Sequence, residues 1–421
     1  MVQAILKSLL GGDNVKAIIQ AAKNMHPADV VDILREISLE EQEKFFLLLP
    51  YELAADILQE MDLTEEVAVL NRLDAARAAE ILRHMYTDEA ADLLAELEKD
   101  KADELLVLMN EEGREIKELM EYKEDTSGGL MATEYIAVNE EQTVSEVLAY
   151  LRKAAPSAEN AYYIYVVKAD QTLLGIVSLR ELVTAPVGTK IGQIMKKDIV
   201  KVPENMDQEE VAHLFEKYGF LVLPVVDNDG KLAGIITVDD VLDVTEEEAT
   251  EDIHKAGSVS PLKTSYSSAN IWTLFSKRIG WLVGLIFVNL ASSGVIAAFE
   301  KTLSSAISLA FFIPLLIDTG GNTGSQSATL IVRALVTGDV KLSHWARTLT
   351  KELTVGVLLG LVLGLAGWGL GLFRGGFLIG AVVGLTMLII VIISNIIGML
   401  LPFLLTKLKL DPAVASSPLI T

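Results

Sequence analysis

The sequence contains no cysteine, so disulfide bonds and thiolate metal sites are excluded. Histidine is scarce, and the five histidines, at positions 26, 84, 213, 254 and 344, never form the His-Glu-x-x-His spacing of a zinc protease. The loop ending in Gly-Lys-Ser or Gly-Lys-Thr that binds phosphate in ATP-driven pumps is also missing. We therefore do not expect the chain to be an enzyme.

Basic residues are few relative to acidic ones, with 35 lysines and arginines against 58 aspartates and glutamates and a net charge of −23. Residues 1–260 hold 53 of the acids and 24 of the basic residues, whereas residues 261–421 hold 5 and 11. An acidic surface repels nucleic acid and attracts cations. At 421 residues the chain is also too long for a single core, so we expect several domains and no nucleic-acid partner.

Long apolar stretches follow residue 270, at 279–299, 303–332, 353–373 and 375–406. Each reaches the roughly 20 residues that an α-helix needs to cross a bilayer. The fourth is longer, which implies tilt, a kink at Pro402 or an end outside the lipid. Lysines and arginines gather before the first stretch, between the second and third, and after the fourth. The positive-inside rule therefore places the N-terminal half and the 333–352 loop in the cytoplasm of a multi-pass protein, which we expect in the bacterial inner membrane.

Glycines recur every four residues at 356, 360 and 364 and again at 376, 380 and 384, a spacing typical of closely packed membrane helices. The second apolar stretch differs, because it brings a proline, an acid, glycines and amides to membrane depth. Helix-breaking, polar backbone inside lipid survives only where it faces protein or a water-filled path. The candidate pore-lining residues are Pro314, Asp318, Gly320, Gly321, Asn322, Gly324 and Gln326.

Two internal repeats organise the first half. An apolar-acid-apolar-Leu pattern recurs at 31, 55, 79, 91 and 103, which predicts short amphipathic helices stacked as a right- or left-handed superhelix. The 174–182 segment then matches 233–241 at an offset of 59, and each copy reads helix, strand, strand, helix. This second pair resembles tandem CBS domains, which usually act as regulatory ligand sensors.

The segment 238–255 is rich in acids, with Asp240, Asp243, Glu247 and Glu251 on one helix face and Glu248 and Asp252 on the next. Like charges at this spacing destabilise a helix unless cations neutralise them, and hard divalent cations prefer carboxylate oxygen. The fold class expected is multidomain: an all-α superhelical domain (1–125), an α/β tandem CBS pair (126–186 and 187–245), a connecting helix (246–270) and an α-helical transmembrane bundle (271–421).

With these parts in this order, the whole chain resembles the MgtE family of magnesium channels. The most specific marks are the 314–327 segment, the Ala-Thr-Glu-Asp-Ile-His-Lys run at 249–255 and the Leu-Asp-Pro-Ala motif at 410–413. The resemblance implies a homodimer in the bilayer, with a pore between subunits lined mainly by the second and fifth spans. It also implies that cytosolic Mg²⁺ closes the pore through a "plug" helix, and that the CBS pair can bind ATP.

The resemblance further implies a set of metal ligands. Those on the superhelix and the end of the second CBS unit are Asp56, Asp88, Asp92, Asp240 and Asp243. Those of the clasp near the pore are Glu248, Glu251, Asp252 and Asp411. Glu209, with Glu216, is implied at the CBS dimer interface, where Gly219 stands in place of a ligating acid found in some members.

The end of the chain departs from the family pattern. After Asp411-Pro412, residues 413–421 resemble the start of a fifth span, which we expect either to re-enter the membrane partway or to be incomplete. The aspartate that holds hydrated magnesium in the family's pore would come after Thr421. The alternative function is a CBS- or nucleotide-regulated transporter of another ion or solute, although the apolar spans offer no basic residues for an anion path.

Overall fold

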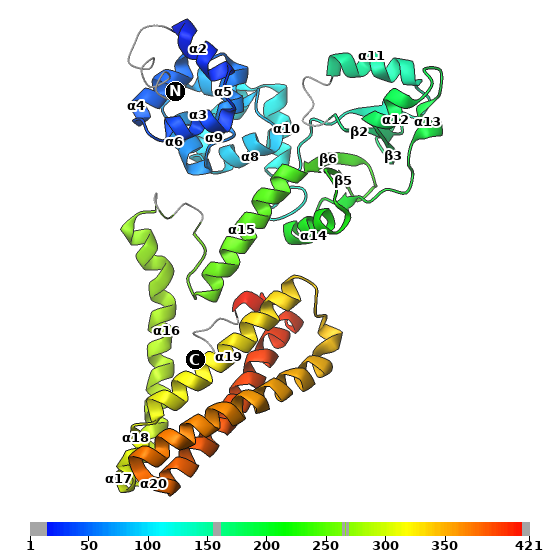
Figure 1. Ribbon diagram of the computed structural model, residues 1–421. Helices are drawn as coiled ribbons and strands as arrows, with labels where there is room; N and C mark the ends of the chain where they lie inside the picture. The colour runs from blue at the N-terminus through cyan, green and yellow to red at the C-terminus, as the bar shows by residue number, and fades with distance from the viewer. Residues whose placement is uncertain (1–14, 155–160, 263–265, 267–268, 415–421) are drawn as a thin grey trace. The chain divides into compact units, whose positions relative to one another are not determined.

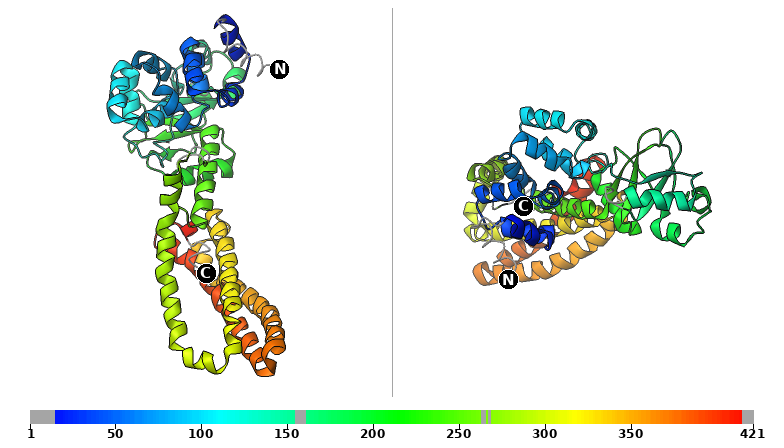
Figure 2. Two further views of the ribbon diagram at one scale, coloured as in Figure 1. Left: turned by 90° about the vertical axis from the view of Figure 1, so that its left-hand side faces the viewer. Right: turned by 90° about the horizontal axis from the view of Figure 1, so that it is seen from above.

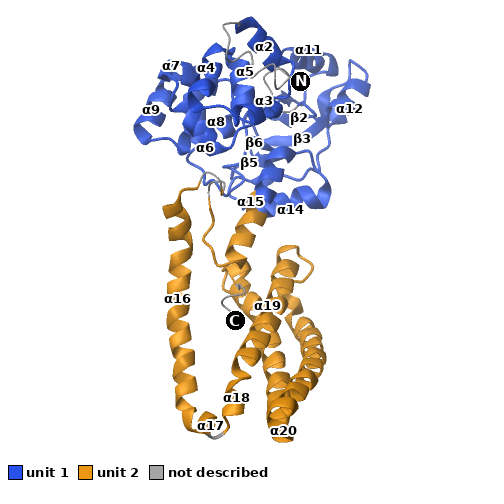
Figure 3. Cartoon of the chain, turned by 60° about the vertical axis from the view of Figure 1, so that its left-hand side comes forward, with its two compact units in different colours: residues 1–246 blue, residues 247–421 orange. Residues whose placement is uncertain are grey.

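The computed structural model describes residues 15–154, 161–262, 266 and 269–414, and the chain divides into two compact units, Met1–Glu246 and Glu247–Thr421 (Figure 3). The predicted tail at 415–421 lies outside the described residues.

The described part of the first unit begins with short helices that start every 12 residues. These are α2 (Val15–Lys23), α3 (Pro27–Leu34), α4 (Leu39–Leu48), α5 (Tyr51–Leu58), α6 (Leu63–Leu70), α7 (Ala75–Leu82), α8 (Thr87–Ala95), α9 (Lys99–Leu108) and α10 (Glu111–Leu119). Side chains at the helix starts cap free backbone amides: Ser38 and Glu41 form a capping box, and Asp74 Oδ1 accepts a hydrogen bond from the backbone N–H of Arg77. The regular stacked helices that the sequence repeat predicts are confirmed.

Alternate helices pack together: α3, α5, α7 and α9 form one row, and α4, α6, α8 and α10 form the other. The apolar positions of each repeat, such as Ile57, Leu58, Ile81 and Leu82, are fully buried between the rows. Burying one such side chain contributes about 1.5–3 kcal/mol, so the repeat itself stabilises the superhelix. The acids within these patterns, such as Asp56, are exposed, except for Glu80, which is half-buried.

Two similar three-stranded sheets follow. The first contains β1 (Ala137–Asn139), β2 (Tyr163–Val167) and β3 (Leu173–Ser178), and the second contains β4 (Val202–Pro203), β5 (Val222–Val226) and β6 (Leu232–Thr237). In each sheet the outer first strand is parallel to the middle strand, which is antiparallel to the last. Tyr163 pairs with Ser178 in one sheet and Val222 with Thr237 in the other, so the 59-residue offset holds in the register.

The helices of these units are α11 (Val144–Ala154), α12 (Leu179–Thr184), α13 (Ile191–Ile194) and α14 (Gln208–Tyr218). A shared apolar core that includes Tyr165, Leu173 and Ile235 joins the two sheets. The helix α15 (Val238–Ala256) begins directly after β6 and carries the acid-rich segment.

The second unit consists of α16 (Ile271–Ala298), α17 (Glu300–Ser305), α18 (Ile307–Ala310), α19 (Ile313–Val336), the short 3-10 turn η2 (Leu342–His344), α20 (Trp345–Lys407) and the turn η3 (Pro412–Val414). Among the residues that the structure describes, two helical segments are long and apolar enough to cross a membrane by length and composition, Ile271–Ala298 and Leu342–Lys407. The second, of 66 residues, contains a reversal at Gly376, whose φ of 80° and ψ of −176° are not helical. The predicted third and fourth spans are therefore two antiparallel halves of α20, seen in orange and red in Figures 1 and 2.

The two halves of α20 approach each other through glycines. A Cβ added at Gly364 would lie 2.9 Å from the carbonyl oxygen of Gly384, and one at Gly371 would lie 2.6 Å from the Cα of Gly380. No larger residue fits at such distances without moving a backbone. The predicted packing role of the spaced glycines is confirmed, except that Gly376 forms the turn.

The second predicted span, 303–332, differs from the structure. Its first part is divided between α17 and α18, because Ala306 leaves helical geometry at φ −139° and ψ 61°. The helix α19 starts one residue before Pro314 and continues without a break to Val336. The expectation of helix-breaking backbone between 314 and 327 is therefore wrong, because proline is tolerated in the first turn of a helix. In the fourth span α20 likewise continues through Pro402 to Lys407.

Candidate ion path and regulatory metal sites

The helix α19 has two faces of opposite character. Asp318, Asn322 and Gln326 are spaced by four residues and exposed on one face, where Asn322 Nδ2 donates a hydrogen bond of 3.2 Å to Asp318 Oδ2. Pro314 is exposed one turn earlier. An aspartate that faces lipid costs up to about 3 kcal/mol, the value at the centre of a span, so a polar face of this kind is typical of a helix that borders water or another protein.

The glycines of the same segment lie on the other face. Gly320, Gly321 and Gly324 are buried, and a Cβ on Gly320 would lie 2.6 Å from Cγ2 of Ile390. Gly398 approaches Gly324 so closely that a Cβ there would lie 2.1 Å from the Gly324 carbonyl oxygen. The structure thus divides the seven candidate pore residues into an exposed polar stripe and a buried glycine contact with α20.

A polar junction that the sequence analysis missed fixes α19 against both halves of α20. Glu352 Oε2 accepts hydrogen bonds of 2.9 Å from Ser327 Oγ and 2.9 Å from Asn395 Nδ2, while Asn395 also donates to the Glu352 carbonyl at 2.7 Å. Ser327 and Asn395 are buried. Glu352 stands just before the uncharged 353–373 stretch, so hydropathy alone indicated only a span boundary.

In the first unit, two helix starts bring Asp88 and Asp240 together. Asp240 Oδ2 accepts hydrogen bonds from the backbone N–H and the hydroxyl of Thr237 at 2.9 and 2.7 Å, and Asp88 Oδ1 accepts one from the N–H of Glu89 at 2.9 Å. Burial, and then the charge of Asp240, raises the pKa of Asp88 well above its usual range. The pKa of Asp240 is also raised, chiefly by burial. These two acids therefore oppose each other's ionisation.

Two glutamates extend this cluster, and neither was predicted. Burial and neighbouring acids raise the pKa of Glu66 on α6 to about 8 and that of Glu89 on α8 to about 9. Glu66 is 3% exposed, and its Oε2 has no hydrogen-bond partner among the described residues. Asp92 adds its charge to both. The described chain places no lysine or arginine in an ion pair with Asp88, Glu89, Asp240 or Glu66.

The other predicted ligands of this unit lie outside the cluster's buried part. Asp56 is on the exposed face of α5, where burial and Glu52 raise its pKa and His84 lowers it. Burial raises the pKa of Asp243 as well, and its charged neighbours are Glu246, Asp239 and Glu60. The structure therefore brings together Asp88, Asp92 and Asp240 but not Asp56.

The remaining candidates of the CBS pair are on α14. Glu209 is partly exposed in its first turn, and Glu216 is exposed, with its Oε2 3.8 Å from Nδ1 of His213. Gly219 ends the helix in the left-handed conformation, with φ 66° and ψ 41°. That conformation favours glycine, which is a local reason for the missing acid.

In the second unit, a lysine stands among the predicted clasp residues. Lys255 Nζ contacts a carboxylate oxygen of Glu251 one turn back and lies 2.5 Å from Asp411 Oδ2. These contacts outweigh burial and raise the pKa of Lys255 to about 12. Burial and the charge of Asp411 raise the pKa of Asp252, whereas Lys255 lowers it. Three predicted ligands, Glu251, Asp252 and Asp411, are thus gathered around one ammonium group.

Neither the cluster around Asp88 and Asp240 nor the one around Lys255 provides a complete coordination shell for a dehydrated metal ion. Among the residues that the structure describes, no three carboxylate or imidazole side chains converge closely enough to hold a metal. Magnesium retains several waters and is commonly held through one or two carboxylates. The paired acids of both clusters therefore fit a hydrated divalent cation, which would replace the missing positive charge beside Asp88 and Asp240.

The fold and these sites define a class of protein. Two helical segments long and apolar enough to cross a membrane, a helix with a polar stripe packed against the second of them, and a helical domain and a CBS pair with buried acids in the same chain are the arrangement of a regulated membrane transporter. The sequence matches the family profiles "MgtE intracellular N domain" at 25–125, "CBS domain" at 127–188 and 191–247, and "Divalent cation transporter" at 313–421.

The chain belongs to the MgtE family. It is 43% identical over 419 residues to the magnesium transporter MgtE of Thermus thermophilus, which covers 99% of this chain and 93% of that protein. It is also 38% identical over 313 residues to the magnesium transporter MgtE of Enterococcus faecalis, covering 74% of this chain and 68% of that protein. These relatives are transporters rather than enzymes.

Two solved structures resemble the first half. The soluble part of a magnesium transporter covers 59% of this chain and 98% of its own length, with 33% identity and a TM-score of 0.57. The cytosolic domain of the Mg²⁺ channel MgtE in complex with ATP covers 57% and 99%, with 40% identity and a TM-score of 0.55. The expected superhelical domain followed by a CBS pair is confirmed.

Proposed function

We propose that this chain is the subunit of a homodimeric magnesium channel of the bacterial inner membrane, with the exposed stripe of α19 lining the path between two copies. The observation that carries the proposal is this stripe, Asp318, Asn322 and Gln326, which nothing covers within the described chain. A second copy placed against it removes the cost of exposing an acid to lipid. The relatives named as magnesium transporters support magnesium as the substrate.

Cysteine accessibility tests whether the stripe faces water. Because the chain has no cysteine, an introduced cysteine is the single thiol that a reagent can label. Asp318→Cys, Asn322→Cys and Gln326→Cys are each expected to react with a charged, membrane-impermeant thiol reagent in proteoliposomes. Ile317→Cys, exposed beside the stripe but on another face, is the matched control and should not react. Equal labelling of all four positions, or of the control alone, contradicts a water-filled path along this face.

The same variants test the dimer. A disulfide formed by Asn322→Cys can only join two copies, because each chain then holds one cysteine. Oxidation in the membrane should give a covalent dimer for positions on the stripe and none for Ile317→Cys. Failure at all stripe positions, with labelling intact, contradicts the two-copy pore while leaving a water-filled path within one copy.

We further propose that cytosolic Mg²⁺ closes this path. In the first unit the ion would bridge Asp88 and Asp240, with Asp92 beside them, while Asp56 and Asp243 would serve a more exposed position. Near the bundle, Glu248, Glu251, Asp252 and Asp411 would form the clasp, and Glu209 with Glu216 would bind at the interface of paired CBS units. The helix α15 carries Asp240 near its start and Asp252 near its end, so the same helix supplies a ligand to each proposed site.

Magnesium gating requires only that binding favour the closed state by a few kcal/mol. Protease protection of 238–260 is expected at millimolar Mg²⁺ but not at the same ionic strength of NaCl. Neutralising Glu248, Glu251 and Asp252 together should leave the channel open at high Mg²⁺. Closure of that variant at the parent's magnesium concentration contradicts the clasp.

The CBS pair is proposed to bind ATP. The support is the 40% identical cytosolic domain solved in complex with ATP. Calorimetric titration of the purified chain with ATP tests this, and absence of binding at millimolar ATP contradicts it.

A further inference from the structure

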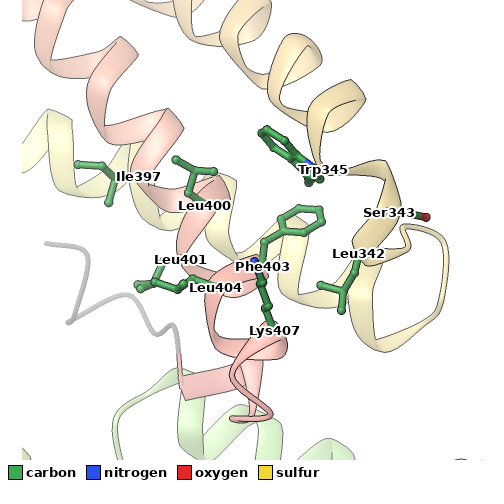
Figure 4. Close-up of a pocket in the computed structure, with 9 residues that line it drawn as sticks. All are labelled: Leu342, Ser343, Trp345, Ile397, Leu400, Leu401, Phe403, Leu404 and Lys407. Atoms are coloured by element: carbon green, nitrogen blue, oxygen red, sulfur yellow. The ribbon is translucent and has the colours of Figure 1, made fainter.

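The membrane unit contains an open apolar groove at one end of its helices. It has a volume of about 890 Å³ and lies between two parts of the chain that are far apart in sequence (Figure 4). One wall is η2 and the start of α20, with Leu342 and Trp345, and the other is the last turns of α20, with Leu400 and Leu404. Trp345 is 51% and Leu404 is 53% exposed, so the described chain leaves the groove uncovered. Lys407 stands at its end.

The surroundings of the groove are positively charged. Lys341, Arg347, Lys351, Lys407 and Lys409 are all exposed, and none forms an ion pair within the residues that the structure describes. The acid of the preceding loop, Asp339, has no such contact either. Lys407 lines the groove, and Lys341, Arg347 and Lys409 stand within two residues of its lining in the sequence. Unpaired basic residues beside an apolar surface match a ligand with a negative head and an apolar body.

The position of the groove along the membrane normal also fits a ligand with a negatively charged head. The helices α19 and α20 both end beside it, and tryptophan is enriched where membrane helices meet the headgroup region. The positive-inside rule assigns this end to the cytoplasmic leaflet, whose anionic lipids attract lysine and arginine near the surface. We propose that the groove binds an anionic phospholipid, with an acyl chain on Leu400 and Leu404 and the phosphate at Lys407.

A second copy of the chain is a less suitable occupant. Residues 261–421 contain 5 acids against 11 basic residues, so another membrane unit would bring like charge to these basic residues. Basic pockets at the cytoplasmic ends of membrane helices commonly receive lipid head groups. The lipid would also hold the loop after α19 against the end of α20, which links lipid binding to the helix that carries the polar stripe.

Fluorescence quenching by brominated lipids tests the proposal. Replacing Trp272, Trp281 and Trp368 by phenylalanine leaves Trp345 as the single tryptophan reporter. In mixed micelles with limited lipid, brominated phosphatidylglycerol should quench Trp345 at several-fold lower concentration than brominated phosphatidylcholine. Lys407→Gln should reduce that preference about fivefold, the contribution of one basic side chain near an anionic surface. Lys301→Gln, exposed at the opposite end, is the matched control and should not change it.

The outcomes are distinct. Equal quenching by both lipids, or a preference that survives Lys407→Gln, overturns the proposal. Absence of quenching together with a disulfide-linked dimer of Ser343→Cys identifies a second copy as the occupant and also overturns it. Native mass spectrometry of the unaltered chain, which should retain phosphatidylglycerol in preference to phosphatidylcholine, guards against misfolding of the tryptophan variant.

Discussion

Replacing Lys255 by methionine isolates the role of the ammonium group inside the proposed clasp. Methionine keeps an unbranched side chain but removes the charge that contacts Glu251 and Asp411. Magnesium bound at the same carboxylates must displace this ammonium, so the lysine competes with the ion. We expect Lys255→Met to bind Mg²⁺ more tightly than the parent, although its plug helix is held less firmly when magnesium is absent.

The magnitude follows from the ion pairs. The pKa of Lys255 rises from 10.5 to about 12, which corresponds to about 2 kcal/mol of net attraction. The carboxylates are partly exposed, 38% for Glu251 and 34% for Asp411, and solvent screening reduces the value to about 1 kcal/mol. The magnesium concentration at half protection should therefore fall about fivefold.

The assay is limited proteolysis of 238–260 across a magnesium titration. Endoproteinase Glu-C is required, because Lys255 is the segment's only trypsin site, whereas glutamates stand at 246, 247, 248 and 251. Lys255→Met should be cleaved faster than the parent without Mg²⁺ and be protected at lower Mg²⁺. Lys255→Arg keeps the charge and should resemble the parent, as should Lys301→Met. A midpoint that is unchanged or raised in Lys255→Met would refute the competition.

Three further predictions concern packing and pH. Gly398→Ala should lower the melting temperature in detergent by several degrees, because its Cβ overlaps the Gly324 carbonyl oxygen; Gly369→Ala, where nothing lies within 4 Å, is the control and should have little effect. Asn395→Ala should cost about 1–2 kcal/mol, because it removes the hydrogen bonds from Asn395 to the carboxylate and the carbonyl of Glu352 and leaves Ser327 as the remaining donor to that carboxylate; an unchanged unfolding midpoint would contradict that junction. Glu66, with a folded-state pKa of about 8 against 4.5 unfolded, binds its proton more tightly in the native state, so its contribution to stability is lost as pH rises between these values. Calorimetry in magnesium-free buffer should find Glu66→Gln more stable than the parent at pH 8 and similar at pH 4, and parallel pH profiles would contradict the assignment.

The folds of the helical domain and of the CBS pair could be predicted because each is built from a sequence repeat. A 12-residue period of buried leucines leaves little choice but short stacked helices, and the 59-residue offset predicts two equal units. The strands β1 and β4 were missed, because three and two residues are too short for an alternating pattern. Their parallel pairing with β2 and β5 comes from the tertiary fold.

The acid clusters were predictable only in part. Asp88 and Asp240 were named through family resemblance, whereas Glu66 and Glu89 each stand in the first turn of a helix, where an acid ordinarily interacts with the helix dipole. The pKa values of Glu66 and Glu89 are raised because α6 packs against α8, a tertiary contact that no local sequence pattern predicts. Lys255 at four residues from Glu251 resembles an ordinary helical ion pair. Its second partner, Asp411, lies 156 residues away and no local pattern predicts it.

The 314–327 segment explains why composition alone misjudged the second span. Small residues in a membrane helix are compatible either with a broken backbone or with close packing of an intact one. The choice depends on the opposite surface, and here Ile390, Ser394 and Gly398 of α20 meet the glycines of α19. Because the helix stays intact, a period of 3.6 residues separates its polar side chains from its glycines. The proposed ion path is consequently lined by side chains of a continuous helix, and substitutions at Gly320 or Gly324 should affect the assembly of the bundle rather than ion contact.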